Sequence, residues 1–166
     1  MVSAISPGVL GTTGIETVEI LKGIVDNIKP KLIIVIDALA SRSIERISST
    51  VQISDTGIVP GAGVGNTRSE ISKTTLGIPV IAIGIPTVVE TAVLVNDCLD
   101  LFIQKLQNDA KSNDYLNNLK ENDNYEEIKD ALIPNDFNMI VTPKEIDDLI
   151  ENMGSVVARG INFSIN

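Results

Sequence analysis

A chain of 166 residues is long enough for one domain, and an apolar fraction of 43% can supply a substantial core. Aromatic residues make up only 3%, so the core must be built from Ile, Val and Leu, as in a parallel sheet flanked by helices. The net charge of -9 argues against nucleic acid or an anionic membrane as a direct partner. The chain has no His, which excludes Ser-His-Asp and Cys-His sites and removes the commonest zinc ligand.

The N-terminal region has the pattern of a strand, a loop and a helix. Residues 1–5 are short and apolar and are compatible with a strand. Apolar residues at helical spacing then predict a helix over 15–28, ended by Pro30. Thr13 and Glu16 have the spacing of a capping box at its start. With the next strand, this predicts a βαβ unit.

Five consecutive aliphatic residues, Leu32 to Ile36, predict a strand that is buried on both faces of the sheet. Asp37 follows this run directly. Because sites in open α/β sheets form at the carboxyl ends of the strands, Asp37 is the first candidate for chemistry. The alternative is that Asp37 caps the next helix or turn.

Two arginines follow Asp37. A short helix over 38–47 would place Arg42 and Arg46 on one face, because they are four residues apart. Their guanidinium groups could lower the pKa of Asp37 or bind acidic groups of a substrate. The alternative is a weak surface ion pair between Glu45 and a neighbouring base.

Further binding candidates lie in the next two loops. The triplet Asp55-Thr56-Gly57 also occurs in pepsin-like proteases, but those are all-β, and a turn is sufficient to explain it here. Residues 59–66 form a glycine-rich loop without the Gly-Lys-Ser/Thr ending of a phosphate loop. Its glycines would allow positive φ or a close substrate backbone. The candidates for substrate binding are Arg42, Arg46, Asp55, Gly63, Asn66 and Arg68.

The second half of the chain predicts a strand over 80–83 and a long amphipathic helix over 89–106, opened by a capping box at Thr87 and Glu90. Cys98, within this helix, is expected to be a small core or boundary residue. Residues 107–130 are polar and predict a mobile surface insertion. A last strand is expected within 137–141. A helix should follow over 146–157, opened by a third capping box at Thr142 and closed at Gly160.

Six segments of this chain, taken in order, resemble the germination protease of spore-forming Firmicutes. The segment Asp-Ala-Leu-Ala-Ser-Arg-Ser, which starts at Asp37, is the most specific. The matching segments are Ser3–Thr17, Ile36–Arg46, Gln52–Ile58, Gly61–Asn66, Leu76–Gly84 and Val141–Ile146.

The resemblance implies an atypical aspartic endopeptidase of the forespore and spore core that cleaves small acid-soluble spore proteins during germination. It implies a zymogen, a homotetramer and a preference for acidic residues around the scissile bond. The implied fold is a three-layer α/β/α sandwich around a mainly parallel sheet, similar to that of the hydrogenase-maturation proteases. One of the family's two functional aspartates falls on Asp37. The other lies in a segment upstream of those present here.

We therefore expect residues 1–166 to form a single α/β domain, the C-terminal part of a longer peptidase, with no cofactor. One carboxylate of a catalytic pair should not activate water alone, so the isolated chain should be inactive. One alternative is a non-catalytic module for folding, assembly or peptide binding. Another is a metal-assisted hydrolase that uses Asp37 and Asp55.

Overall fold

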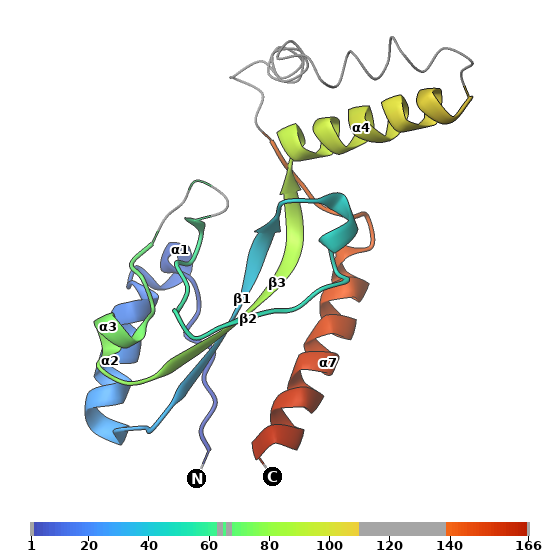
Figure 1. Ribbon diagram of the computed structural model, residues 1–166. Coiled ribbons are helices and arrows are strands. Elements are labelled where there is room, and N and C mark those ends of the chain that lie inside the picture. The colour runs from blue at the N-terminus through green and yellow to red at the C-terminus, as the bar shows by residue number, and fades with distance from the viewer. Residues whose placement is uncertain (1, 63–64, 66–67, 110–138, 166) are drawn as a thin grey trace. The chain divides into compact units, whose positions relative to one another are not determined.

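The computed structural model describes residues 2–62, 65, 68–109 and 139–165. The chain divides into two compact units, Met1–Leu39 with Val51–Ile85 and Ala40–Thr50 with Pro86–Asn166. The expected single domain therefore stays a prediction. The elements in chain order, labelled in Figure 1 where there is room, are α1 (Leu10–Thr13), α2 (Thr17–Ile28), β1 (Ile33–Ser41), the 3-10 helix η1 (Ile44–Arg46), β2 (Gln52–Ser54), α3 (Lys73–Leu76), β3 (Val80–Glu90), α4 (Thr91–Asp109), β4 (Ile140–Val141) and α7 (Ile146–Ile165).

The sheet is open and mixed. The strand order is β1-β3-β2, and β4 also pairs with β3. Figure 1 draws β1 and β3 running in the same direction. Both β2 and β4 are antiparallel to β3, with Ile53 opposite Ile83 and Val141 opposite Val89. The α/β class is as the sequence predicted, but the sheet is mixed rather than mainly parallel, because antiparallel β2 and β4 are added to the pairing of β1 with β3.

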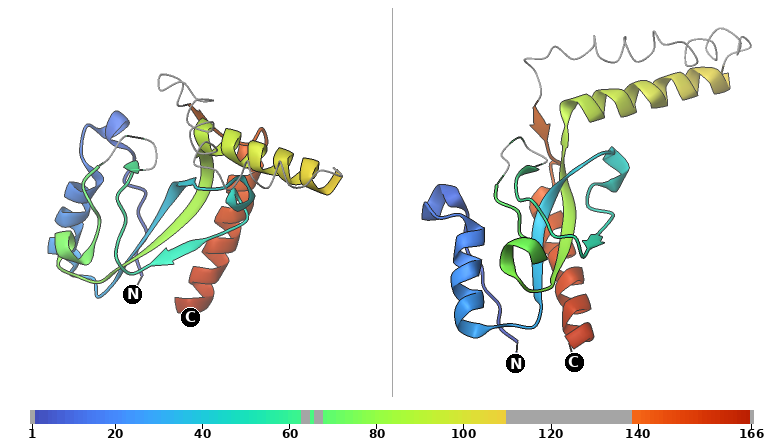
Figure 2. Two further views of the ribbon diagram at one scale, coloured as in Figure 1. Left: turned by 45° about the horizontal axis from the view of Figure 1, so that its top comes forward. Right: turned by 60° about the vertical axis from the view of Figure 1, so that its left-hand side comes forward.

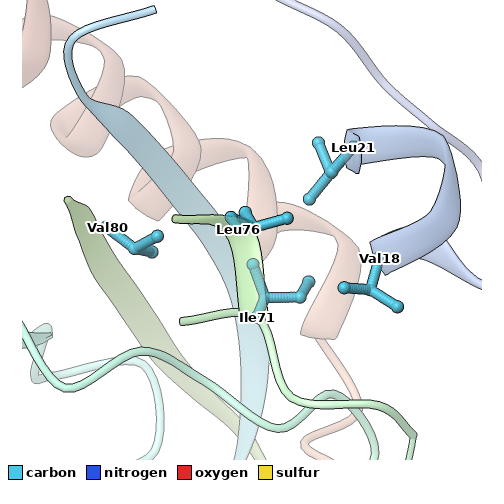
Figure 3. Close-up of a cluster of buried hydrophobic side chains, with 5 residues drawn as sticks. All are labelled: Val18, Leu21, Ile71, Leu76 and Val80. Atoms are coloured by element: carbon cyan, nitrogen blue, oxygen red, sulfur yellow. The ribbon is translucent and has the colours of Figure 1, made fainter. Parts of the chain in front are cut away.

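The core of the first unit lies between α2, α3 and the sheet. Repeated apolar residues give α2 one buried face, and this face packs against α3 (Figure 2). The partly buried Ile33 and Val35 of β1 pack against the same cluster. Figure 3 shows the five buried side chains of this cluster, Val18, Leu21, Ile71, Leu76 and Val80.

The start of α2 corrects the expected capping box. The N-cap is Glu16, and no side chain caps the helix there. The Thr13 hydroxyl instead accepts a hydrogen bond from the Ile15 backbone N–H at 3.2 Å and so stabilises the turn before the helix. The other end agrees with the prediction, since α2 ends at Ile28 and its C-cap residue, Lys29, lies in the left-handed region at φ 51°, directly before Pro30.

The first two predicted strands also need correction. Residues 2–9 form no strand, so the predicted βαβ unit lacks its first member in the described chain. The strand predicted to end at Ile36 continues to Ser41. That strand is not buried on both faces either, because the side chains of Leu32 and Ile36 are 44% and 51% exposed.

Helix boundaries in the second unit differ from the prediction at both ends. The segment of the second capping box, Thr87 to Glu90, is part of β3, and α4 starts at Thr91. The Thr142 hydroxyl does not cap α7 but donates a hydrogen bond to the Thr87 carbonyl at 3.1 Å. Helix α7 continues past Gly160 to Ile165.

Cys98 is exposed, so its assignment to the core or boundary is wrong. Residues 110–138, which include most of the predicted polar insertion, lie outside the described residues. Within 107–109 the chain still belongs to α4. Among the described residues no helix is long and apolar enough to cross a membrane.

Candidate functional site

Asp37 lies within β1 rather than after it. Successive strand residues alternate between faces, so Asp37 shares a face with Val35 and Leu39. Val35 packs against the hydrophobic core. The Leu39 side chain occupies the space that a side chain at Gly84 of β3 would need. The carboxyl group of Asp37 is therefore placed between two apolar neighbours on the core-facing side of the strand.

This environment raises the pKa of the Asp37 carboxyl above its ordinary value of 3.8. The largest cause is burial, which removes water from the charged form, and a hydrogen bond from the Ala38 backbone acts in the opposite direction. The direction is opposite to the lowering that adjacent guanidinium groups would produce. A carboxyl whose neutral form is favoured in this way can hold and deliver a proton.

Asp55 lies on an exposed turn directly after β2. The Ser54 hydroxyl accepts a hydrogen bond from the Thr56 backbone N–H at 3.1 Å, as expected for the turn that the sequence predicts. Gly57 closes the turn at φ +95°, and Ile58 then pairs with Ile71 through backbone hydrogen bonds of 3.0 and 2.8 Å. The turn interpretation of this triplet is confirmed.

The glycine-rich loop is described only in part. Gly61 and Gly65 have φ of 73° and 69°, which confirms that glycines give this loop left-handed positions. Arg68 is half-buried, and its backbone N–H donates a hydrogen bond to the Pro60 carbonyl at 3.0 Å. The candidates Gly63 and Asn66 lie outside the described residues. In the part of the chain that the structure describes, none of Asp37, Asp55 and Arg68 forms an ion pair with any residue.

Arg42 and Arg46 do not share a helix face, because β1 extends to Ser41 and only Ile44–Arg46 is helical, as a 3-10 turn. Both arginines are exposed. Among the described residues neither forms an ion pair, so the expected alternative, a pair with Glu45, is not formed. Within the described ranges, no carboxylate therefore competes with an external anion for either guanidinium group.

Hydroxyl groups fix the backbone around these arginines. Ser41 is buried, and its hydroxyl donates to the Ser43 carbonyl at 2.5 Å. At the other end, the Thr50 hydroxyl donates to the Arg46 carbonyl at 3.2 Å. The Ser48 backbone N–H donates to the Pro86 carbonyl at 2.9 Å, which ties the segment to β3. We call Ser41–Thr50 the arginine turn.

Sequence reasoning missed one residue of this arrangement. Asp97 of α4 accepts a hydrogen bond from the Ile44 backbone N–H at 2.9 Å through Oδ2. This bond satisfies a free donor at the start of η1 and joins the arginine turn to α4. The two residues are 53 positions apart, so no local motif could have indicated the contact.

The described residues contain no group of three or more Cys, Asp or Glu side chains that could hold a metal ion. The metal-assisted alternative built on Asp37 and Asp55 therefore gains no support from the geometry.

Comparison with known proteins gives a consistent result. A family model described as germination protease matches residues 1–119 and 114–166. The chain is 52% identical to the germination protease of Clostridium perfringens (strain 13 / Type A) and 53% identical to that of Caldanaerobacter subterraneus subsp. tengcongensis, in each case over 99% of this chain and 52% of the relative. The germination protease of Bacillus licheniformis is 42% identical, over 99% of this chain and 54% of the relative. The chain thus spans about half the length of the curated relatives it matches. By the family model and these identities, the chain belongs to the germination protease family.

Proposed function

We propose that this chain is the C-terminal part of an aspartic endopeptidase that hydrolyses small acid-soluble spore proteins in the spore core when the spore germinates. Asp37 is one of two catalytic carboxylates, and the second belongs to the half of the family chain that these residues do not span. The observation that carries this proposal is the environment of Asp37, a half-buried carboxyl that lies between Val35 and Leu39 on the core-facing side of β1 and whose pKa is raised by burial.

The chemistry needs two carboxyl groups in different protonation states. One, ionised, accepts a proton from the attacking water, and the other, neutral, donates a proton to the substrate. Burial favours the neutral form of Asp37, which supports a role as the member that holds the proton. One such carboxyl cannot supply both functions, so the isolated chain is catalytically incomplete.

Exposed arginines support the substrate assignment. Arg42 and Arg46 have no ionic partner among the described residues and lie on a segment held by several hydrogen bonds. Guanidinium groups bind carboxylates by paired, charge-assisted hydrogen bonds. We assign them to the acidic residues that flank the scissile bond. Asp55, Gly63, Asn66 and Arg68 are retained as further substrate-binding candidates.

The complete protein would then be a zymogen that assembles as a homotetramer, without a cofactor. Its sheet would be covered by helices on both faces, in the three-layer arrangement of the hydrogenase-maturation proteases. The coarse features that support this part are the mixed α/β architecture and the family membership.

The test is cleavage of an acid-soluble spore protein by four samples. These are the chain alone, the chain fused to the remaining half of the Clostridium perfringens relative, and that fusion with Asp37→Asn or with Asp26→Asn, which changes an exposed carboxyl of α2. We expect cutting only by the wild-type fusion and by the fusion with Asp26→Asn. Cleavage by the chain alone would show that the second carboxylate is not required. An inactive but folded wild-type fusion would favour the non-catalytic module.

A further inference from the structure

We propose that Asp97 is a positioning residue for substrate recognition, which holds the arginine turn in the conformation that presents Arg42 and Arg46 to acidic peptide groups. The inference rests on the proposed function, because it takes acidic peptides as the ligand. It goes beyond that function by assigning a role to a carboxylate outside the proposed catalytic and substrate-binding groups.

One hydrogen bond holds the backbone at the centre of the arginine turn. Ser43 is extended, at φ -161°, and η1 begins at the next residue with a free backbone donor. Asp97 Oδ2 accepts that donor, the Ile44 N–H, at 2.9 Å in a part-buried environment. A charged acceptor makes this bond stronger than one between neutral groups. The bond thereby fixes the direction in which the chain leaves Ser43.

Both arginines lie within two residues of the bonded Ile44 N–H along the chain. Arg42 precedes the bonded N–H by two residues, and Arg46 is the last residue of η1. Both side chains are long and exposed, so only the backbone restricts where their guanidinium groups reach. Binding two acidic groups at once requires both arginines to be held at one spacing. Loss of the Asp97 bond leaves this spacing variable, and ordering it again reduces affinity.

Electrostatic repulsion alone predicts that removing Asp97 strengthens binding of an acidic peptide, whereas loss of positioning weakens it. The direction of the change in affinity therefore tests the inference. Asp97 is an anion joined to the segment that carries the arginines. If Asp97 acted only through its charge, its removal would strengthen binding of an acidic peptide, because a repulsive charge is lost. If Asp97 positions the turn, its removal weakens binding.

The experiment measures binding of two fluorescent peptides by the whole 166-residue chain. One peptide is Glu-rich, and in the other every Glu is replaced by Gln. We expect Asp97→Ala to weaken binding of the Glu-rich peptide by about fivefold or more. Binding of the neutral peptide should change little. Asp97→Asn keeps an acceptor oxygen at the same place and should restore most of the affinity.

Three controls separate the possible failures. Asp26→Ala removes an exposed carboxylate of α2 and should leave binding of both peptides near the wild-type value. Arg42→Ala and Arg46→Ala test the proposed arginine contacts themselves, and each should weaken binding of the Glu-rich peptide. Unchanged or tighter binding by Asp97→Ala, with weaker binding by both arginine variants, would overturn the positioning role alone.

Equal losses for both peptides would overturn the inference as well, because they would indicate a general structural defect. A wild-type chain without preference for the Glu-rich peptide would also overturn it. That result would leave the peptidase assignment intact, since the cleavage assay tests it separately. The Ile44 amide gives an independent readout, because its hydrogen exchange should accelerate in Asp97→Ala and not in Asp97→Asn.

Discussion

At the scale of single residues, backbone conformation explains why Asp55, Thr56 and Gly57 occur together, although the same triplet is also found in pepsin-like proteases. Gly57 has φ +95°, and a Cβ there would lie 2.7 Å from the Ser72 Cβ and would also meet the Ile71 carbonyl oxygen. The glycine is thus required by both conformation and space. The triplet Asp55-Thr56-Gly57 is a means of turning the chain toward its pairing with Ile71.

Gly57→Ala should therefore destabilise the protein by about 2 kcal/mol or more, because the left-handed penalty adds to the steric conflict. Gly65 also has a positive φ, 69°, but a Cβ on Gly65 would meet no atom of the described residues within 4 Å. Gly65→Ala should cost only the conformational part, about 1 kcal/mol. Urea denaturation of the two variants measures the difference. Equal losses would contradict the steric argument.

A second prediction at this scale concerns the pH dependence of stability. Burial raises the pKa of Asp37 above 3.8, so ionisation costs more in the folded state than in the unfolded state. Below that pH the carboxyl is neutral in both states and the cost is absent. As the pH rises through the unfolded and then the folded pKa, the unfolded state ionises first and stability falls.

Asp37→Asn should consequently gain stability relative to wild type between about pH 3 and about pH 7, since Asn carries no charge. The measurement is urea denaturation of both proteins at the two pH values. Asp55→Asn, which changes an exposed carboxyl in a turn, is measured alongside as the control for the loss of a carboxyl elsewhere on the chain. A relative loss for Asp37→Asn at neutral pH would mean that its charge is stabilised rather than desolvated.

At the scale of helices and strands, periodic apolar patterns predicted which segments form helices, whereas most element boundaries were not predicted. The helices around Val18 and Val157 were predicted, because a long stripe of apolar residues determines which face is buried. None of the three predicted capping boxes, at Thr13, Thr87 and Thr142, caps its helix. At Thr87 the strand simply continued, and Thr142 bonds to Thr87 instead of its own helix, so tertiary pairing prevailed over local motifs.

The same distinction holds for the candidate site. Asp37 was identified as a candidate because the aliphatic residues before it predict a strand, although that strand extends beyond Asp37 to Ser41. The raised pKa of Asp37 could not be predicted, since it depends on how far the folded chain buries this carboxyl. The contact of Asp97 with Ile44 could not be predicted, because the two residues are distant in sequence.

The packing of α2 gives a prediction for this scale. Leu21 is 8% exposed and belongs to the core cluster with Val18 and Ile71. Leu21→Ala should cost about 2–4 kcal/mol through lost apolar contact and the remaining cavity. Ile28, at the end of the same helix, is 56% exposed. Ile28→Ala should cost less than about 1 kcal/mol, and a similar cost for both would place the core elsewhere.

The contact between Leu39 of β1 and Gly84 of β3 leads to a second prediction about packing. The Leu39 side chain fills the position that a Cβ on Gly84 would occupy. Gly84→Ala should therefore destabilise the wild type by about 1–3 kcal/mol, the usual cost of overpacking. In the Leu39→Ala background the same change should cost much less, because the space is free. A double-mutant cycle by thermal denaturation measures this coupling, and additive effects would show that the two sites do not compete for one space.

At the scale of the whole molecule, the net charge of -9 and the proposed acidic ligand act against each other. Two exposed arginines attract an acidic peptide at short range, whereas the chain as a whole repels it at long range. Ionic strength separates the two effects, because the screening length is about 30 Å at 0.01 M salt and about 10 Å at 0.1 M. At low salt the approaching peptide experiences the whole negative charge, and at moderate salt it experiences mainly the arginine turn.

Association of a Glu-rich peptide should therefore become faster when salt is raised from about 0.01 M to about 0.1 M, by about twofold to tenfold. Stopped-flow fluorescence at both salt concentrations measures the rate, and a peptide with Gln in place of Glu is the control that should show little change. A decrease in rate for the Glu-rich peptide would mean that the arginines dominate the field even at long range. The arginine turn would then steer the encounter as well as bind the ligand.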